Sequence, residues 1–365
     1  MTALTTPARP ARVLIVDDSR SIRGWLRHVL EQDPRLEVAG EAADSTAARD
    51  LVRTDRFDVM TLDVDMPGMS GLDFLARLMA RRPLPVVMMS AYTDKGSTAA
   101  LEALSLGAVD CIAKPRTQPG PEQLAMICQT VWDAAQTRVQ RSTARQAPAA
   151  PLTPALARGQ RRDWTGQIVL CGASTGGVAA IEALLREIDH VPSPIVIAQH
   201  MPEMFLRSFT RRLNEQFGRN FVLAEDGLVL KEGMGVLALG KNVSTRLEHV
   251  SGGRLRCALG PPSDGAIYRP NVNDLFLSGA AVGCVAAAAL LTGMGDDGAR
   301  GLSALRAAGS VTYAQSEESC VVYGMPRRAV ELDAAMTVGA PDRIGREIAA
   351  LDAVANGTAR RMARS

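Results

Sequence analysis

Five short apolar segments recur across residues 12–133, each followed by a turn and an amphipathic stretch, and this repeat constrains the fold more than any other feature. The segments are Val13–Val16, Leu36–Ala39, Val59–Asp63, Pro85–Met89 and Cys111–Ala113. Continuous apolar runs of this length are typical of parallel strands that are covered on both faces. The repeat therefore predicts a doubly wound, flavodoxin-like α/β domain.

With 365 residues, the chain is long enough for a second domain. Residues 164–354 again alternate apolar and amphipathic segments, which predicts another doubly wound parallel sheet with its strand order left open. The strands expected there are Ile168–Cys171, Ile195–Gln199, Val236–Leu239, Val285–Thr292 and Ser310–Tyr313. Between the domains, residues 134–163 combine prolines with arginines and predict a flexible basic linker. Residues 1–11 and 355–365 are expected to be disordered.

Composition excludes several classes of protein. The 41 Lys and Arg residues nearly balance 39 Asp and Glu residues, and the linker arginines lack interleaved aromatics, so a nucleic-acid partner is disfavoured. Six cysteines without a C-x-x-C pair predict free thiols in a reducing cytoplasm. We expect neither a signal peptide nor membrane insertion, because the apolar run at residues 280–291 is too short to span a bilayer.

Charged and hydroxyl side chains follow the strands of the first domain, and the carboxyl ends of parallel strands share one edge of the sheet. These residues are Asp17, Asp18, Asp63, Ser90 and Lys114. Clustered carboxylates predict a Mg²⁺ site, beside which one aspartate could attack a phosphoryl group while the lysine and serine hold its oxygens. Taken singly, Asp18 could instead cap a helix, and Lys114 could be ordinary surface.

The stretches Val13–Ser19, Leu62–Pro67 and Ala113–Pro115 resemble those of response-regulator receiver domains. The resemblance implies phosphorylation of Asp63 by a histidine kinase. It also implies Mg²⁺ ligands from Asp17, Asp18, Asp63 and the Asp65 carbonyl. One departure concerns the switch residue: receivers usually carry an aromatic residue three positions before the lysine, where this chain has Cys111.

In the second domain, the segment Gly172–Gly177 places Ser174 on a glycine-flanked turn between a predicted strand and a predicted helix. Such a turn can expose a nucleophilic serine to a carbonyl carbon. It can equally cradle a phosphate at the start of the helix. The residues of the turn leave both interpretations open.

Two further strand ends favour the nucleophile. His200 follows one strand and could serve as the base, although it could also simply cap a helix. Asp296 and Asp297 follow another strand, and either could accept the Nδ1 proton of His200 or cap the next helix. Three strand ends that supply a serine, a histidine and an aspartate predict a serine-hydrolase triad in an order unlike that of α/β-hydrolases.

Four motifs resemble the catalytic domain of the CheB family of chemotaxis methylesterases. They are Gly172–Gly177, Gln199–Pro202, Leu291–Gly298 and Val322–Pro326. The resemblance implies that Asp297 completes the triad with Ser174 and His200. It also implies hydrolysis of glutamate methyl esters on chemoreceptors, deamidation of receptor glutamines, no cofactor for the esterase, and a CheA-type histidine kinase as phosphodonor. A resting receiver would restrain the enzyme domain until Asp63 is phosphorylated. Backbone N–H groups near Thr175 and Met294 are the candidates for the oxyanion hole.

Two segments depart from the family pattern. The usual Arg-Pro-Ser-Val-Asp reads Arg269–Asn273 here, with amides at positions 271 and 273, and the usual Ala-Pro-Gly-Gly-x-His reads Ala238–Val243. Both changes could alter the rim of the site. A phosphorylation-dependent adaptor with a degenerate or re-targeted esterase domain is therefore an alternative. A transcription factor is disfavoured, since no helix-turn-helix pattern follows the linker.

Overall fold

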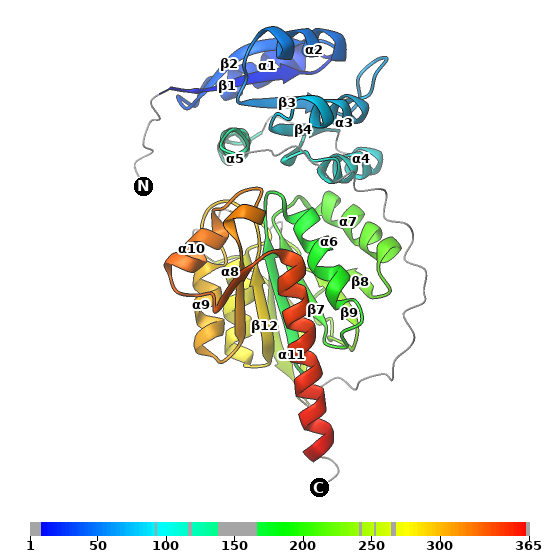
Figure 1. Cartoon of the computed structure of the whole chain (residues 1–365), viewed down its shortest axis with the longest axis vertical. Coiled ribbons are helices and arrows are strands. Elements are labelled where there is room, and N and C mark those ends of the chain that lie inside the picture. The colour runs from blue at the N-terminus through cyan, green and yellow to red at the C-terminus, as the bar shows by residue number, and fades with distance from the viewer. Residues whose placement is uncertain are drawn as a thin grey trace. The chain divides into compact units, whose positions relative to one another are not determined.

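The computed structural model describes residues 9–91, 93–115, 119–137, 166–240, 243–251, 253–263 and 268–362. The chain divides into two compact units, Met1–Arg145 and Gln146–Ser365 (Figure 1). Most of the predicted linker and of the predicted disordered N-terminus lies outside the described residues. No helix that the structure describes is both long and apolar enough to cross a membrane.

The first unit is a five-stranded parallel sheet in the order β2-β1-β3-β4-β5, which confirms the predicted fold. Its strands are β1 (Ala11–Val16), β2 (Leu36–Ala42), β3 (Val59–Asp63), β4 (Val86–Ser90) and β5 (Asp110–Ala113). Its helices are α1 (Arg20–Leu30), α2 (Ser45–Thr54), α3 (Gly71–Arg81), α4 (Asp94–Ser105) and α5 (Pro121–Ala135).

Both faces of this sheet are buried at its central strands β1, β3 and β4, which explains why these strands lack polar alternation. On β1, Val13 and Ile15 belong to a core cluster that includes residues of α1 and α5. The alternate residues Leu14 and Val16 belong to a second cluster with residues of α2, α3 and α4. Because successive side chains of a strand point to opposite faces, an apolar run of this kind requires helices on both sides.

The second unit is a seven-stranded parallel sheet in the order β14-β13-β12-β6-β7-β9-β8. Its strands are β6 (Ile168–Ala173), β7 (Ile195–Gln199), β8 (Asn220–Leu223), β9 (Met234–Leu237), β12 (Val285–Leu290), β13 (Val311–Gln315) and β14 (Thr337–Gly339). Its helices are α6 (Gly177–Ile188), α7 (Glu203–Gln216), α8 (Val272–Val282), α9 (Ala299–Ala307), α10 (Met325–Glu331) and α11 (Pro341–Met362).

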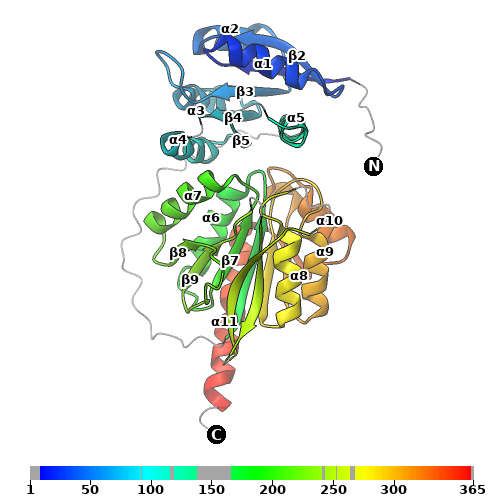
Figure 2. The ribbon, with the colours of Figure 1, turned by 180° about the vertical axis from the view of Figure 1, so that it is seen from behind.

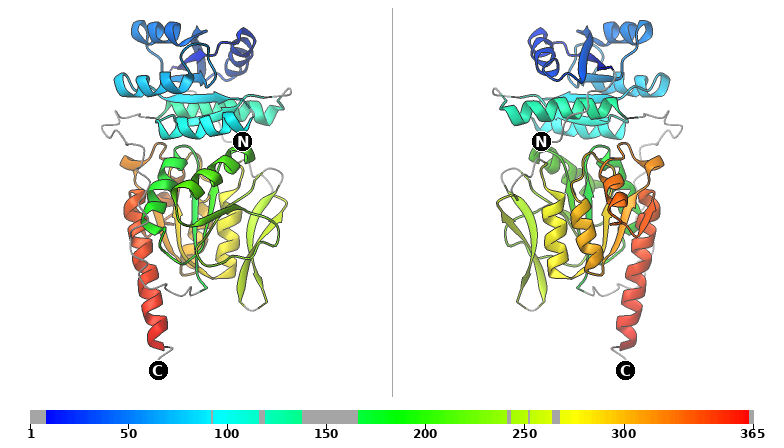
Figure 3. Two further views of the ribbon diagram at one scale, coloured as in Figure 1. Left: turned by 90° about the vertical axis from the view of Figure 1, so that its right-hand side faces the viewer. Right: turned by 90° about the vertical axis from the view of Figure 1, so that its left-hand side faces the viewer.

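Helices cover both faces of the larger sheet. Helices α6 and α11 lie together in front of it in Figure 1, and α8 and α9 lie side by side in front of it when it is seen from behind in Figure 2. An antiparallel hairpin, β10 (Ser244–Val250) and β11 (Arg254–Gly260), stands apart from the sheet beside α8 (Figure 3). Strand order reverses at β6, which has β7 on one side and β12 on the other, so its carboxyl end is a topological switch point.

Several elements of the second unit differ from the sequence-based expectation. Strands β8 and β14, the hairpin and helices α8 and α11 were not predicted. The prediction of a disordered tail from residue 355 is wrong for residues 355–362, because α11 continues to Met362. Alanine and arginine favour the helical backbone, and the tail contains no proline to end the helix.

Candidate catalytic and phosphorylation sites

Ser174 lies in the turn between β6 and α6, at the switch point of the larger sheet. Its backbone is held from both sides: its N–H donates to the Thr292 carbonyl (3.0 Å), and its carbonyl accepts from Gly177 N–H (2.8 Å) and from Gln199 Nε2 (2.8 Å). The turn requires glycine at position 177, because a Cβ there would lie 2.0 Å from Gln199 Oε1. Ser174 is therefore fixed on a rigid turn at the carboxyl end of β6.

His200 follows the neighbouring strand β7, and its N–H donates to the Ala173 carbonyl, next to Ser174 (3.0 Å). Its Nε2 lies 2.8 Å from Asp297 Oδ2, and both side chains are buried. The prediction that Asp297 would bind Nδ1 is therefore wrong. Nδ1 is buried and has no hydrogen-bond partner among the residues that the structure describes. His200 thus has one ring nitrogen bound to the carboxylate and one available to a reacting group.

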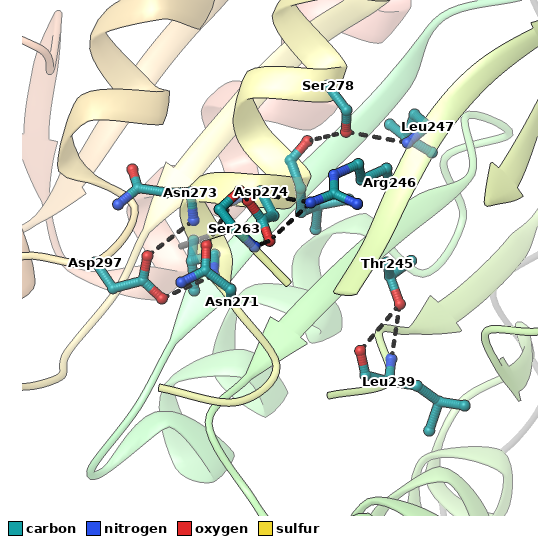
Figure 4. A network of polar contacts seen from close by, with 12 residues as sticks. Leu239, Thr245, Arg246, Leu247, Ser263, Asn271, Asn273, Asp274, Ser278 and Asp297 are labelled. Atoms are coloured by element: carbon teal, nitrogen blue, oxygen red, sulfur yellow. Dashed lines mark hydrogen bonds and ion pairs between the residues drawn. The ribbon is translucent and has the colours of Figure 1, made fainter. Parts of the chain in front are cut away.

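The Asp297 carboxylate lies at the N-terminus of α8. Its Oδ2 accepts from Val272 N–H (2.8 Å) and its Oδ1 accepts from Asn273 N–H (2.9 Å), as Figure 4 shows for Asn273. These N–H groups belong to the first residues of the helix, which have no partner within it. They and the helix dipole favour a negative charge, so the carboxylate is stabilised and oriented beside His200.

The amides that depart from the family pattern cap helices. Asn271 Oδ1 accepts from Asp274 N–H (2.7 Å) as the N-cap of α8, and Asn273 Oδ1 accepts from Gly301 N–H (2.8 Å) in the first turn of α9. An amide oxygen here does what a serine hydroxyl or a carboxylate oxygen could do. The substitutions therefore preserve the support of Asp297, which removes the main observation in favour of a degenerate esterase.

In the second departing segment, the turn is held by Thr245, a residue that lies outside the motif. Its Oγ1 accepts from Leu239 N–H (2.9 Å) and donates to the Leu239 carbonyl (3.2 Å), as Figure 4 shows. Gly240 approaches Pro270 so closely that a Cβ would lie 2.1 Å from the proline Cα. The turn therefore supports the segment that leads into α8; residues 241 and 242 lie outside the described residues.

Two residues of the site were not found from the sequence. Thr292 Oγ1 donates to the Thr175 carbonyl (3.0 Å) and accepts from Val322 N–H (2.9 Å), which joins the Ser174 turn to the segment before α10. Tyr268 stacks on His200, with ring centroids 4.9 Å apart and planes 4° from parallel. The motif that contains Thr292 was a usable signal, whereas no spacing in the sequence indicates the stack.

The first unit brings its predicted acidic residues together. Asp17, Asp18 and Asp63 each place a carboxylate oxygen within 4.8 Å of the others. Lys114 Nζ lies 2.7 Å from Asp17 Oδ2 and 2.8 Å from Asp63 Oδ1, and Asp65 N–H donates to Asp63 Oδ1 (3.3 Å). Burial raises the pKa of Asp63 despite the hydrogen bond from Lys114. Burial lowers the pKa of Lys114, but hydrogen bonds to Asp17 and Asp63 outweigh it and leave that pKa raised.

Ser90 and Cys111 lie beside this cluster but bind to helix α4. The buried Ser90 hydroxyl donates to the Gly96 carbonyl (2.7 Å) instead of facing Asp63. Cys111 Sγ lies 3.3 Å from the Ala100 carbonyl, and burial raises the pKa of its thiol. The position usually held by a switch aromatic is thus filled by a small side chain packed under α4.

Two family models match the chain: the response regulator receiver domain at residues 13–124 and the CheB methylesterase at residues 169–348. A receiver joined to an enzyme domain defines a response regulator with an enzymatic output. The protein-glutamate methylesterase/protein-glutamine glutaminase 1 of Caulobacter vibrioides is 45% identical over 329 residues, covering 88% of this chain and 92% of the relative. A relative of the same activity name from Rhizobium etli is 43% identical over 349 residues, covering 94% and 97%. The chain therefore belongs to the CheB methylesterase family.

Proposed function

We propose that this protein hydrolyses glutamate methyl esters on chemoreceptors, releasing methanol, and deamidates receptor glutamines under control of its receiver domain. The relatives' activity names support the reaction class. The observation that carries the assignment of residues is the buried pair of His200 Nε2 and Asp297 Oδ2, which lie 2.8 Å apart. This pairing leaves Nδ1 of His200 available just after β7, the strand next to the one that leads into Ser174.

The proposed reaction begins when Ser174 Oγ attacks the ester carbonyl carbon while His200 Nδ1 takes the hydroxyl proton. Nε2–H donates to Asp297 throughout, so the carboxylate fixes the tautomer and stabilises the imidazolium. The tetrahedral intermediate collapses, the carbon–methoxide bond breaks, and Nδ1–H protonates the departing methoxide. Water then attacks the acyl-enzyme with Nδ1 as base, which frees the glutamate carboxylate and restores Ser174.

Deamidation uses the same acyl-enzyme, with ammonia as the leaving group in place of methanol. The oxyanion needs backbone donors near Ser174, and we assign this role to N–H groups near Thr175 and Met294. The Ser174 N–H itself is bound to the Thr292 carbonyl. Gly293 supports this choice, because it approaches Ser174 so closely that a Cβ there would lie 2.6 Å from the serine Cβ.

In the receiver, Asp63 would attack the phosphorus of a histidine kinase phosphoimidazole, breaking the N–P bond as the carboxyl–phosphate bond forms. The cluster fits Mg²⁺, because three carboxylate groups converge while Lys114 pairs with only two of them, Asp17 and Asp63. Asp17, Asp18, Asp63 and the Asp65 carbonyl would hold the ion, which offsets charge on the phosphoryl oxygens. Lys114 would then release the Asp63 carboxylate and bind the phosphoryl group.

Phosphorylation would then shift the equilibrium between restrained and active enzyme states. The Ser90 hydroxyl is suited to report the event, since turning from the Gly96 carbonyl toward a phosphoryl oxygen would change its contact with α4. We assign chemoreceptors as substrates and a CheA-type histidine kinase as the phosphodonor. All six cysteines are free, which supports action in the reducing cytoplasm.

A serine-directed fluorophosphonate tests this proposal against the adaptor alternative. The full chain should take up one phosphonyl group, located at Ser174 by peptide mass spectrometry, and the Ser174→Ala variant should take up none. Ser208 is a buried serine of α7 that serves as a matched control, so Ser208→Ala should label like the parent. Absence of labelling in the parent protein would favour the adaptor.

A further inference from the structure

We infer that Tyr268 is a positioning residue that fixes the plane of the His200 ring during the proposed reaction, on which this inference rests. The two rings are stacked nearly parallel, with planes 4° apart and centroids 4.9 Å apart. Tyr268 is neither one of the three proposed triad residues nor part of a motif that indicates chemistry.

The hydrogen bond to Asp297 alone does not define the orientation of His200. It holds Nε2 at one edge of the ring, while the opposite edge carries Nδ1, which has no partner among the described residues. Nδ1 must nevertheless lie in the direction of the Ser174 hydroxyl for proton transfer. A flat aromatic surface against one ring face restricts rotation and so determines where Nδ1 points.

Tyr268 also contacts the segment that carries Asp297. Its phenol oxygen lies beside Gly295, where a Cβ would be 3.1 Å from the oxygen, and Gly295 has a φ of +74° that glycine adopts readily. The tyrosine ring thus spans from the base to the loop of its carboxylate partner. Its position links the two side chains independently of their mutual hydrogen bond.

The stack has an electrostatic consequence as well. His200 becomes an imidazolium when it takes the serine proton, and the face of an aromatic ring attracts a cation. The carboxylate of Asp297 lies at the ring edge, bound to Nε2, so it and the tyrosine face contact the imidazolium from different sides. Removing the ring face should therefore slow the step that forms the imidazolium, because the charged ring loses a favourable contact.

The test compares Tyr268→Phe with Tyr268→Leu in the full chain, using methanol release from methylated receptor membranes. Phe keeps the ring and should retain kcat within about twofold. Leu should lower kcat by about tenfold with little change in KM, since the interaction acts on the base rather than on substrate binding.

An unchanged kcat for Tyr268→Leu would overturn the inference, as would a rise in KM with constant kcat, which would make Tyr268 a substrate contact. A Phe variant as impaired as Leu would assign the effect to the phenol hydroxyl. If Leu does not fold, Tyr268→Met removes the planar ring at similar length, and the comparison of Phe with Met decides. Loss of activity in the parent enzyme would contradict the proposed function instead.

Discussion

At the scale of single residues, Asp296 and Asp297, the two acidic residues that follow β12, differ in burial and in hydrogen bonding. Asp297 is buried and receives hydrogen bonds from two N–H groups of α8, whereas Asp296 is exposed. A buried carboxylate that accepts several hydrogen bonds is held in one position, whereas an exposed one can turn in the solvent. This environment makes Asp297 the partner that can orient the histidine.

The support of Asp297 by helix α8 yields a prediction at Asn271. The Asn271→Ala variant removes the N-cap acceptor for Asp274 N–H and should cost about 1 kcal/mol in the free energy of unfolding. Fraying of the first turn should also lower kcat, because Val272 and Asn273 donate to Asp297 from that turn. Urea denaturation and methanol release measure the two effects.

Asn271→Ser is the matched control, because a serine hydroxyl can accept the same hydrogen bond. It should restore both stability and kcat to near the parent values. Equal losses in the alanine and serine variants would show that the amide does more than cap the helix.

The residue types of the site were predictable, and their atomic contacts were not. Ser174, His200 and Asp297 each follow an apolar strand, so topology alone brings them to one edge. Which nitrogen faces Asp297 depends on the rotation of one ring, and the Tyr268 stack joins two loops distant in the sequence. Periodicity carries no signal for either contact.

At the scale of elements, the turns after β6 and β12 are packed directly against each other. A Cβ at Gly293 would lie 2.6 Å from Ser174 Cβ and 3.0 Å from its backbone nitrogen. Gly293→Ala should therefore displace the serine and lower kcat by about 100-fold, because misplacement of about 1 Å has an effect of that size. Methanol release measures it.

Gly218→Ala provides the control, since a Cβ there would make only an ordinary contact, 3.5 Å from Asp189 Oδ2. This variant should retain the parent activity. Both proteins should keep a cooperative urea unfolding transition of the enzyme domain, which separates a local effect from misfolding. Full activity in Gly293→Ala would contradict the proposed packing of the site.

Most helices and central strands were predicted because their residues repeat the same burial pattern. Strand β7 has the predicted bounds, Ile195–Gln199. The hairpin β10–β11 was missed although its two strands are separated by a Ser-Gly-Gly turn, a usable signal. Helix α8 was missed because its apolar residues merge with those of β12 in one long run, divided only by Gly283, which ends the helix with a φ of +67°.

At the scale of the whole molecule, the proposed mechanism couples the receiver to the enzyme domain through phosphorylation of Asp63. Acetyl phosphate with Mg²⁺ should raise methanol release severalfold in the parent chain, because the phosphoryl group shifts the domain equilibrium. Asp63→Asn should keep the basal rate and lose the increase. Equal rates with and without phosphodonor in the parent protein would contradict this coupling.

Methanol release from methylated receptor membranes by the parent chain and by Ser174→Ala tests the central claim most directly. The parent protein should release methanol, and the serine variant should be slower by at least about 10⁴-fold, because it cannot form the acyl-enzyme. The urea denaturation of the variant should match that of the parent protein, which shows that its enzyme domain is folded. Undiminished methanol release by Ser174→Ala would contradict the assignment of the nucleophile and the mechanism built on it.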